Sequence, residues 1–226
     1  MVDFTGGTWR SLIDGSEVSA IPDSVVDQSF AWYDFSEEDG ELPVVDRSEN
    51  DNYDEFNLTD GGYSGVNVTI NGVQAGEFDG VDDILETSVV SEGQPNTIHF
   101  VIDAPSQSSN KYIFDSGGAN HQIRILSSDE IDIQGDLDGG DITDSPSVIT
   151  CVFDGDNSEI HQDGVTVASG SIASDSMGDT TTLMARPGND YVDGILGETI
   201  IFPDRDDNRQ SDVEGYLANK WGISLS

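Results

Sequence analysis

The stretch VITCVFDGDNSEIHQDGVTVASG, residues 148–170, decides the fold of this chain. It opens with Val148 to Phe153, six residues that are all apolar or β-branched, as is typical of a buried strand. Asp154-Gly155 and Asp163-Gly164 follow. Asp-Gly is a dipeptide that favours tight hairpin turns, because such turns need residues at positive φ. The stretch therefore predicts successive antiparallel strands.

The same pattern of strand-like runs and turn dipeptides extends over most of the chain. The runs recur roughly every ten residues, and no helical pattern separates them. This spacing predicts an all-β fold, an antiparallel β-sandwich of the jelly-roll type, although it does not fix the strand order. The further runs are 66–70, 97–102, 111–114, 122–126, 130–133 and 198–202, and the further dipeptides are Asn71-Gly72, Asp79-Gly80 and Gly139-Gly140.

One α-helix is predicted, over residues 207–221. Asp207 and Gln210 have the spacing of a capping box, and Gly222 is placed to end the helix in a left-handed conformation. Between them, apolar residues recur at helical spacing. We expect this apolar face to dock on the sandwich and to cover an edge or an end of its core. The apolar positions are Val213, Tyr216, Leu217 and Trp221.

Residues 1–24 differ from the rest and are predicted to form an N-terminal arm. They mix aromatic and aliphatic residues with a glycine pair and show no clear period. A disordered leader is the alternative, but exposing this much apolar surface to water is costly. We expect the arm to pack on a neighbouring subunit or an assembly partner, and residues 25–226 to form the jelly-roll domain with its C-terminal helix. The assembly residues are Phe4, Trp9, Leu12 and Ile13.

The charge of the chain is extreme, with 45 acidic and 8 basic residues and a formal net charge of −37. At low ionic strength such a charge destabilises any compact state by self-repulsion. At about 1 M salt, screening contracts to about 3 Å and the repulsion is largely removed. An acidic disordered chain is the alternative, but the apolar residues make up 35% and gather in strand-like runs. The composition predicts a protein that works in molar salt.

This charge also excludes classes of partner. A surface of this sign repels phosphate backbones and anionic membranes, and no cluster of Lys and Arg offsets it, so we expect no nucleic-acid binding. No stretch approaches the roughly 18 apolar residues of a membrane span, so no membrane insertion is expected. The first residues, MVDFTGG, lack the basic and apolar regions of a signal peptide. We therefore expect a protein made in the cytoplasm. The single cysteine, Cys151, lies in the apolar run 148–153, so it is predicted to be a small buried hydrophobic residue.

Several stretches resemble concanavalin A-like, laminin-G-like jelly-roll modules. Residues 77–85, EFDGVDDIL, are similar to a strand and turn that recur in these modules. Residues 46–52, DRSENDN, resemble a loop upstream of that strand, with Glu49 where the family has glycine. Residues 152–170 resemble a family hairpin. The resemblance continues through a strand at 186–201 and a helix at 213–223, and it implies the same jelly-roll fold for about residues 30–226.

The resemblance implies functions that range from glycan-binding modules, adhesins and virus appendage proteins to glycoside hydrolases. The hydrolases that resemble laminarinases carry alternating carboxylates on one strand, written E-x-D-x-E. Here the corresponding residues are Glu130-Ile131-Asp132-Ile133-Gln134. Gln134 cannot transfer a proton, so the second carboxylate of a retaining pair is absent, and Asp136 on the same face is shorter. We expect no enzyme activity.

Calcium is the cofactor that the resemblance implies, because laminin-G-like modules often hold an ion between rim loops. Hydrated surface acid is the alternative interpretation of each acidic loop, and none fits the twelve-residue EF-hand pattern. His99, His121 and His161 are far apart in the sequence and form no metal-ligand pair. The candidate calcium ligands are Asp46, Asn50, Asp136, Asp138 and Asp141, with the stretch Asp204 to Asp207.

Two functions remain open. The first is a non-enzymatic surface or appendage protein of a halophilic virus, which serves host-glycan attachment, particle structure or both and needs no secretion signal. Such a protein is expected to be a homo-oligomer with other particle proteins as partners. The second is a glycan-binding or weakly glycan-hydrolysing surface protein of a haloarchaeal cell. For either function, we expect aromatic residues of the rim loops to stack on sugars. The candidates are Tyr53, Tyr63 and Tyr191.

Overall fold

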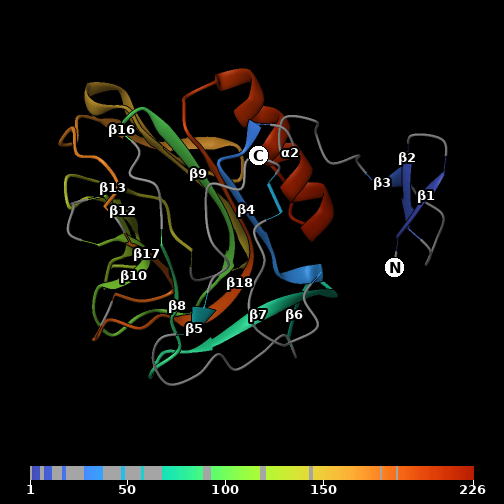
Figure 1. The fold of residues 1–226 in the computed structure, drawn as a ribbon, viewed down its shortest axis with the longest axis horizontal. Helices are drawn as coiled ribbons and strands as arrows, with labels where there is room; N and C mark the ends of the chain where they lie inside the picture. The colour runs from blue at the N-terminus through green and yellow to red at the C-terminus, as the bar shows by residue number, and fades with distance from the viewer. Residues whose placement is uncertain are drawn as a thin grey trace.

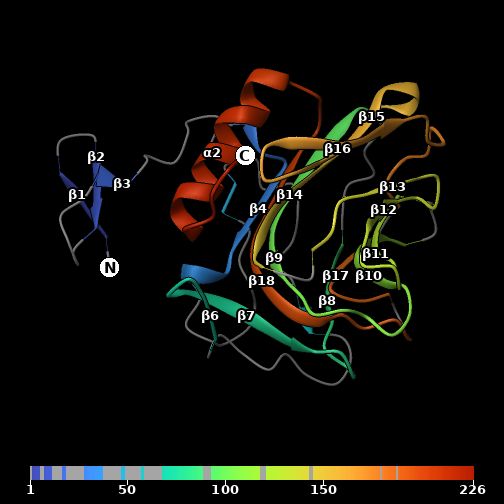
Figure 2. The same ribbon diagram turned by 180° about the vertical axis from the view of Figure 1, so that it is seen from behind.

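A computed structural model shows two antiparallel β-sheets packed face to face, with one long helix against the outside of one sheet (Figures 1 and 2). The predicted fold class, an all-β sandwich with a C-terminal helix, is confirmed. No helix in the part of the chain described is long and apolar enough to cross a membrane. The structure describes residues 2–5, 8–11, 17–18, 28–37, 47–48, 57–58, 68–88, 93–117, 121–142, 145–178, 180–186 and 188–226.

The two sheets are called the front sheet and the back sheet. In spatial order, the front sheet consists of β13 (Leu137–Gly139), β12 (Ile131–Ile133), β11 (Gln122–Ile125), β10 (Lys111–Ser116), β17 (Thr180–Leu183), β8 (Leu85–Ser88) and β5 (Asn57–Leu58). The back sheet consists of β16 (Val165–Gly170), β15 (Ser158–Gln162), β14 (Ser147–Phe153), β9 (Asn96–Asp103), β18 (Asp193–Phe202), β7 (Val73–Asp79) and β6 (Val68–Ile70). A further strand, β4 (Ala31–Asp34), pairs with the second half of β18, beyond the segment that pairs with β7.

The predicted turn dipeptides divide into two groups. Asn71-Gly72 joins β6 to β7 and Asp163-Gly164 joins β15 to β16, with all four residues at positive φ, as expected of two-residue hairpins. Asp154-Gly155 opens a longer hairpin connection between β14 and β15. Asp79-Gly80 and Gly139-Gly140 were wrongly predicted as hairpin turns. The chain crosses from one sheet to the other after each of them.

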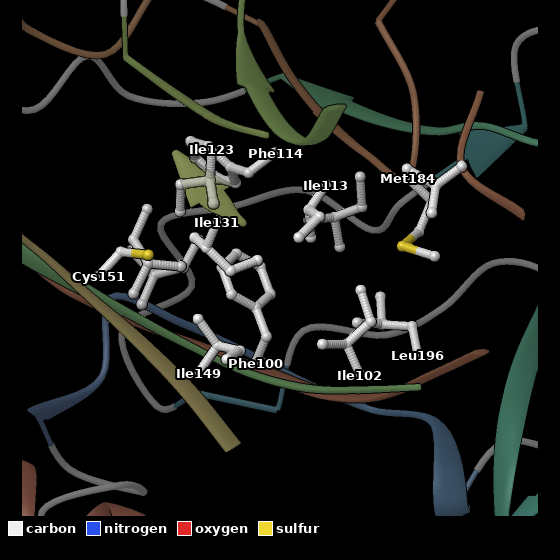
Figure 3. Close-up of a cluster of buried hydrophobic side chains, with 14 of the residues drawn as sticks. Phe100, Ile102, Ile113, Phe114, Ile123, Ile131, Ile149, Cys151, Met184 and Leu196 are labelled. Carbon is white, nitrogen blue, oxygen red and sulfur yellow. The ribbon is translucent and has the colours of Figure 1, made fainter. Parts of the chain in front are cut away.

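The main hydrophobic core lies between the two sheets. Side chains alternate along a strand, so every second residue points inward. Figure 3 shows Phe114 of β10 and Ile123 of β11 facing Phe100 of β9 and Cys151 of β14. Cys151 is fully buried, as predicted, and burial raises the pKa of its thiol.

A second core lies between the outer face of the back sheet and helix α2 (Asp207–Trp221). The helix covers this face, not an edge or an end of the main core, which corrects the prediction (Figures 1 and 2). The reason is that the central strands are apolar on both faces, for example at Val101 of β9 and Ile200 of β18, and the outer apolar side chains need a cover. All the predicted apolar helix positions are buried there, namely Val213, Tyr216, Leu217 and Trp221.

The bounds of α2 agree with the prediction, but its N-cap is one residue earlier than predicted. The side chain of Asp206, not Asp207, accepts hydrogen bonds from the backbone N–H groups of Asn208 and Arg209, at 3.0 and 3.2 Å. At the other end, Gly222 has a φ of 64°, the left-handed conformation expected of it.

A buried charged cluster fixes α2 to the back sheet. Glu198 of β18 is fully buried, and burial raises the pKa of its carboxyl while the charge of Lys220 opposes this. Lys220 Nζ lies 2.8 Å from Glu198 Oε2 and 2.6 Å from Asp34 Oδ2. The other hydrogen bonds to Glu198 come from Trp32 Nε1, Tyr216 Oη and Trp221 Nε1, at 2.7, 3.1 and 2.9 Å.

The N-terminal residues form a small sheet of their own. Strand β1 (Val2–Thr5) pairs with β2 (Thr8–Ser11), which pairs with β3 (Glu17–Val18), and Phe4 is the register partner of Trp9. These strands were not predicted, because the stretch shows no clear period. Within the described ranges they pair with no strand of the sandwich (Figure 1). Leu12, Ile13 and the boundary after residue 24 lie outside the described residues, and the assembly role stays a prediction.

Candidate functional site

The outer face of the front sheet is polar, and among the described residues no helix covers it (Figure 2). Ile123, Ile131 and Leu183 belong to the main core and point inward. Because side chains alternate, their chain neighbours Arg124 and Asp132 point to the outside of the sandwich. This face is the candidate ligand-binding surface.

Two rows of side chains cross this outer face. Neighbouring strands are about 4.8 Å apart, so the members of one row can contact the same ligand. The first row, across β13, β12, β11 and β10, consists of Asp138, Asp132, Arg124 and Tyr112. The second row, across β11, β10, β17 and β8, consists of Gln122, Asp115, Thr182 and Glu86.

Tyr112 lies between two arginines. The guanidinium carbons of Arg124 and Arg186 lie 5.9 and 5.2 Å from the centroid of its ring. Arg124 is neutralised by Asp132, whose Oδ1 lies 2.7 Å from Nε and 2.6 Å from Nη2. Arg186 donates from Nη1 to the Tyr112 hydroxyl at 3.1 Å but forms no ion pair within the described part of the chain. An exposed guanidinium without a carboxylate partner stands out in so acidic a protein.

Asp115 is the carboxylate on this face with incomplete hydrogen bonding. Its side chain is only 3% exposed, and its Oδ1 atom has no hydrogen-bond partner in the structure. Burial raises the pKa of Asp115, while the charge of Arg186 and the Gln122 side chain oppose this. A buried polar atom without a partner costs about 1–3 kcal/mol, and more if it is charged. Such atoms call for an explanation, and an enclosed water or ion is one.

The stretch around Gln134 does not form the strand that a hydrolase of the laminarinase type would need. Strand β12 covers only Ile131–Ile133, and Gln134 has a φ of 58°, which turns the chain toward β13. Burial raises the pKa of Asp132, and Arg124 opposes this. Glu130 is half-buried and accepts a hydrogen bond from Ser128 Oγ at 2.9 Å. Both amide atoms of Gln134 are buried and without a partner.

The structure places one of the three candidate tyrosines beside this face. Tyr191 is half-buried, and its neighbour Asp190 accepts a hydrogen bond from the backbone N–H of Tyr112 at 3.4 Å. Tyr53 and Tyr63 lie outside the described residues. Tyr112 was not among the predicted residues because it lies in a strand-like run, whereas rim loops were expected to supply the stacking aromatic residues.

The described structure does not bring the candidate calcium ligands together. Asp136, Asp138 and Asp141 are exposed, and they do not form a group of three with carboxylate oxygens within 4.8 Å of one another. Asp138 lies in β13, a strand where a loop was expected. Asp46 and Asn50 lie outside the described residues.

The acids of the stretch 204–207 have other partners. Asp204 pairs with Arg209, Asp206 caps α2, and Asp207 Oδ1 lies 2.9 Å from Arg205 Nε. Pairing with arginine and capping a helix account for these carboxylates without an ion.

A different group of carboxylates comes together after β7. Asp79, Asp82 and Asp83 each offer an oxygen within 4.8 Å of the other two, which is a donor set that a divalent cation accepts. Asp79 Oδ1 accepts hydrogen bonds from the N–H groups of Val81 and Asp82, at 2.8 and 3.4 Å. Asp83 Oδ2 accepts from Asp79 N at 2.9 Å. These bonds fix the turn, so the carboxylates of Asp79 and Asp83 already have a structural role.

Among the residues that the structure describes, two hollows lie elsewhere on the sandwich. The larger, about 480 Å³, is lined in part by Arg205 and by its ion-pair partners Asp154, Glu159 and Asp207, at 3.5, 3.1 and 2.9 Å. The smaller, about 360 Å³, is lined by Glu77, Phe78, Asp103, Pro105, Asp193, Gly194 and Ile195. Burial raises the pKa of Asp103 there. Neither hollow contains an unpartnered buried polar group among the described residues that line it.

The three histidines are structural. A histidine on a hairpin strand is usually exposed or half-buried. His161 is buried instead, because the N-terminal half of α2 lies over it. Its ring nitrogens lie 2.9 Å from Glu159 Oε2 and 3.1 Å from Gln210 Nε2. Burial lowers the pKa of His99 to about 3 and that of His121 to about 4.

No family model matches the chain, and no curated protein matches it. Among solved structures, domain 4 of AbnA, a GH43 extracellular arabinanase from Geobacillus stearothermophilus, in complex with arabinotriose, is similar, with a TM-score of 0.55 and 15% identity over 77% of this chain and 92% of that one.

The ligand-binding domain of botulinum neurotoxin serotype D, in complex with N-acetylneuraminic acid, has a TM-score of 0.60 and 12% identity over 87% of this chain and 52% of that one. Trypanosoma rangeli sialidase in complex with sialic acid has a TM-score of 0.57 and 8% identity over 91% and 34%. The chain therefore spans about half of the neurotoxin chain and a third of the sialidase chain. At these identities the likeness shows the fold, a jelly-roll β-sandwich.

Proposed function

We propose that this chain is a non-enzymatic carbohydrate-binding module that works in molar salt, on the surface or an appendage of a halophilic virus. The outer face of the front sheet is its ligand site. The observation that carries this assignment is Arg186, which is exposed, lies against the ring of Tyr112 and forms no ion pair among the described residues. An exposed hydrogen-bonding group that is held in place, with N–H donors left over for a ligand, is what a polar ligand such as a sugar requires.

The structural neighbours support a carbohydrate as the ligand. The arabinanase domain, which this chain matches over nearly all of that domain's length, was solved with arabinotriose. The neurotoxin domain and the sialidase were solved with sialic acids. In the arabinanase domain, a sandwich of this architecture therefore occurs in a sugar-bound protein of very different sequence.

Two observations support a non-enzymatic role. The position that would hold the second catalytic carboxylate is Gln134, which stands in a turn. The remaining central carboxylate, Asp132, is held by Arg124 at 2.6 Å. This carboxylate is poorly placed to attack or protonate a substrate, because its Oδ1 already accepts hydrogen bonds from Arg124 and from the backbone N–H of Gly135.

The setting follows from composition and from the N-terminal sheet. A net charge of −37 suits molar salt, because screening removes the self-repulsion of the folded chain. Strands β1 to β3 pair among themselves, and we assign them to assembly, with further copies of this chain and other particle proteins as partners. A stable oligomer that is lost when residues 1–24 are removed would support this part of the proposal.

A glycan array probed in molar KCl, combined with a screen for glycan hydrolysis, tests the proposal. We expect binding to a defined set of glycans without turnover, and loss of that binding in Arg186→Gln but not in Arg205→Gln. The alternative is a glycan-hydrolysing surface protein of a haloarchaeal cell. Turnover that Glu130→Gln abolishes would establish that alternative and contradict the non-enzymatic role.

A further inference from the structure

We propose that the side chains of Lys220 and Asp34 condense to an amide, an isopeptide bond, with Glu198 as the residue that transfers a proton. The bond ties the end of β4 to the last turn of α2. The chain has a single cysteine and therefore forms no disulfide within itself, so an isopeptide bond is a different route to a covalent link. The proposal does not depend on the proposed function.

The three side chains meet inside the protein, where β4, β18 and α2 come together. Lys220 Nζ lies 2.6 Å from Asp34 Oδ2 and 2.8 Å from Glu198 Oε2. Asp34 is only 3% exposed, and Glu198 is fully buried. Asp34 and Glu198 are register partners on neighbouring strands, so their side chains lie on the same face of the sheet. An amine is thus held against a carboxyl group, which replaces a bimolecular encounter by an intramolecular one.

The lysine stands out against the composition of the chain. Only two of the 226 residues are lysine, Lys111 and Lys220, while six of the eight basic residues are arginine. Arginine pairs with carboxylates through two parallel hydrogen bonds, so an ion pair alone does not call for lysine. A primary amine, in contrast, becomes a nucleophile when it loses its proton. The one residue type that can form an amide is therefore placed between two buried carboxyl groups.

The two oxygens of Asp34 have different partners. Oδ1 accepts hydrogen bonds from the backbone N–H of Ser36 at 3.0 Å and from Ser36 Oγ at 2.7 Å. Oδ2 is the oxygen that contacts Lys220 Nζ. When the amine attacks Cγ, negative charge develops on Oδ1, and donors that are already in place stabilise it. Oδ2 is then the oxygen that leaves.

Glu198 is held in position to carry the proton. Trp32 Nε1 and Tyr216 Oη donate to its Oε1 at 2.7 and 3.1 Å, and Trp221 Nε1 donates to its Oε2 at 2.9 Å. Burial raises the pKa of Glu198, although the charge of Lys220 opposes this. A carboxylate with a raised pKa is a stronger base than an ordinary one, so it can take a proton from the nitrogen and return it to the leaving oxygen.

The reaction balances without any other reactant. One proton passes from Lys220 Nζ to Asp34 Oδ2, which leaves a neutral amine and a neutral carboxylic acid. The nitrogen lone pair attacks Cγ, and the π electrons of the Cγ–Oδ1 bond move onto Oδ1. Glu198 takes a second proton from Nζ and gives it to the Oδ2 hydroxyl. The Cγ–Oδ2 bond breaks, water leaves, and Oδ1 forms a double bond again, while Nζ keeps its third hydrogen as the amide N–H.

The protonation of Lys220 is compatible with this reaction. Burial lowers the pKa of Lys220, but Glu198 and Asp34 raise it further, so the ammonium is the main form. Proton transfer to Asp34 yields two neutral groups, and a buried site favours neutral groups over charged ones. Since the bond forms only once in each chain, a minor population of neutral amine is sufficient. The Lys220 side chain is 15% exposed, which gives the released water a way out.

Intact-mass spectrometry of the full chain tests the proposal. The chain is folded in molar KCl, its fold is checked by circular dichroism, and its mass is then measured in a denaturing solvent. We expect a mass lower by one water molecule than that calculated from the sequence. Protease digestion and tandem mass spectrometry should give one branched peptide that joins the segments around Asp34 and Lys220. A folded wild-type chain with the full calculated mass would overturn the proposal, whatever the variants do.

Three variants test the roles of the residues. Lys220→Arg keeps the charge but has no amine, and Glu198→Gln removes the proton carrier but keeps the shape, so both should retain the full mass. Lys111→Arg, the matched control, should lose one water like the wild type. Loss of water can also come from succinimide formation at an Asp-Gly pair. A loss that persists in Lys220→Arg, or a branch at a carboxyl group other than that of Asp34, would therefore contradict the proposal.

Discussion

The indole Nε1 of Trp221 donates a hydrogen bond of 2.9 Å to Oε2 of Glu198, which joins the last turn of α2 to the central strand β18. Both side chains are fully buried. Lys220 shares the same oxygen, and its pKa is raised by Glu198 and Asp34 even though burial lowers it. A buried carboxylate is tolerated here because each of its oxygens accepts two hydrogen bonds.

Truncation of Trp221 should release the helix from the back sheet. Trp221→Ala is expected to lower the unfolding free energy by about 3–5 kcal/mol, because it removes a large buried ring and one donor to Glu198. Trp221→Phe keeps most of the ring and should cost about half as much or less. Urea unfolding at molar KCl measures both. A cost below about 1 kcal/mol for Trp221→Ala would contradict this picture of the second core.

Gly197 and Gly215 form a matched pair for the packing of α2. A Cβ on Gly197, at the bulge in β18, would lie 2.9–3.0 Å from three atoms of the Trp221 ring, so Gly197→Ala should destabilise by about 1–3 kcal/mol. A Cβ on Gly215, within α2, would meet nothing within 4 Å. Gly215→Ala should therefore stabilise by about 0.5–1 kcal/mol. Equal effects of the two substitutions on the urea midpoint would refute the placement of Trp221 against Gly197.

His99 and His121 make stability depend on pH. Their pKa values, lowered by burial to about 3 and about 4, compare with 6.5 for histidine in the unfolded chain. Below pH 6.5 the unfolded chain binds these protons first, so each histidine lowers the unfolding free energy by about 1.4 kcal/mol per pH unit as the pH falls toward 4. The stability they contribute is thus fully present above pH 6.5 and lost below it.

Carboxyl groups with raised pKa values, among them Asp132 and Glu198, act in the opposite direction, since the folded chain binds those protons first. Comparing a histidine variant with the wild type separates the contribution of that histidine to the pH dependence from the contribution of these carboxyl groups. His121→Gln should have a smaller loss of unfolding free energy between pH 6.5 and pH 4 than the wild type, by up to about 1.4 kcal/mol per pH unit. Parallel pH profiles of the two proteins would show that His121 does not titrate in this way.

Salt should stabilise the whole chain. With a net charge of −37, the melting temperature is expected to rise steeply from low salt to molar KCl, because screening removes the self-repulsion of the folded state. Circular dichroism melting curves over a KCl series measure this, with sucrose at equal osmolality as the uncharged control. A melting temperature that does not change with KCl would remove the basis for a high-salt setting.

The sequence predicted which residues form strands but not which strands lie together. The run 111–114 identifies β10, and alternation identifies the outward residues of β11. The neighbour of β10 on its other side, β17, is about 70 residues away in the chain. A local sequence pattern does not predict which of two such distant strands pair. A bulge between Tyr112 and Phe114 also shifts the register, so alternation along β10 alone misplaces Asp115.

The candidate site was missed for the same reason. In a chain with 45 acidic residues, Asp115 does not differ from its background by residue type. Only the three-dimensional structure shows that it is buried, that its Oδ1 has no partner, and that Arg186 lies nearby. The helix was easier to predict, because its cap, its apolar spacing and its terminal glycine are all local signals.

The most direct test of the central claim is a map of amide chemical shifts in molar KCl as arabinotriose is added to the isotope-labelled chain. If the outer face of the front sheet is the carbohydrate site, the resonances of Tyr112, Asp115, Thr182 and Arg186 should shift together and saturate with one affinity. Shifts confined to the acidic turn at Asp79–Asp83 or to the hollow around Arg205, or no shifts with any glycan, would contradict the claim.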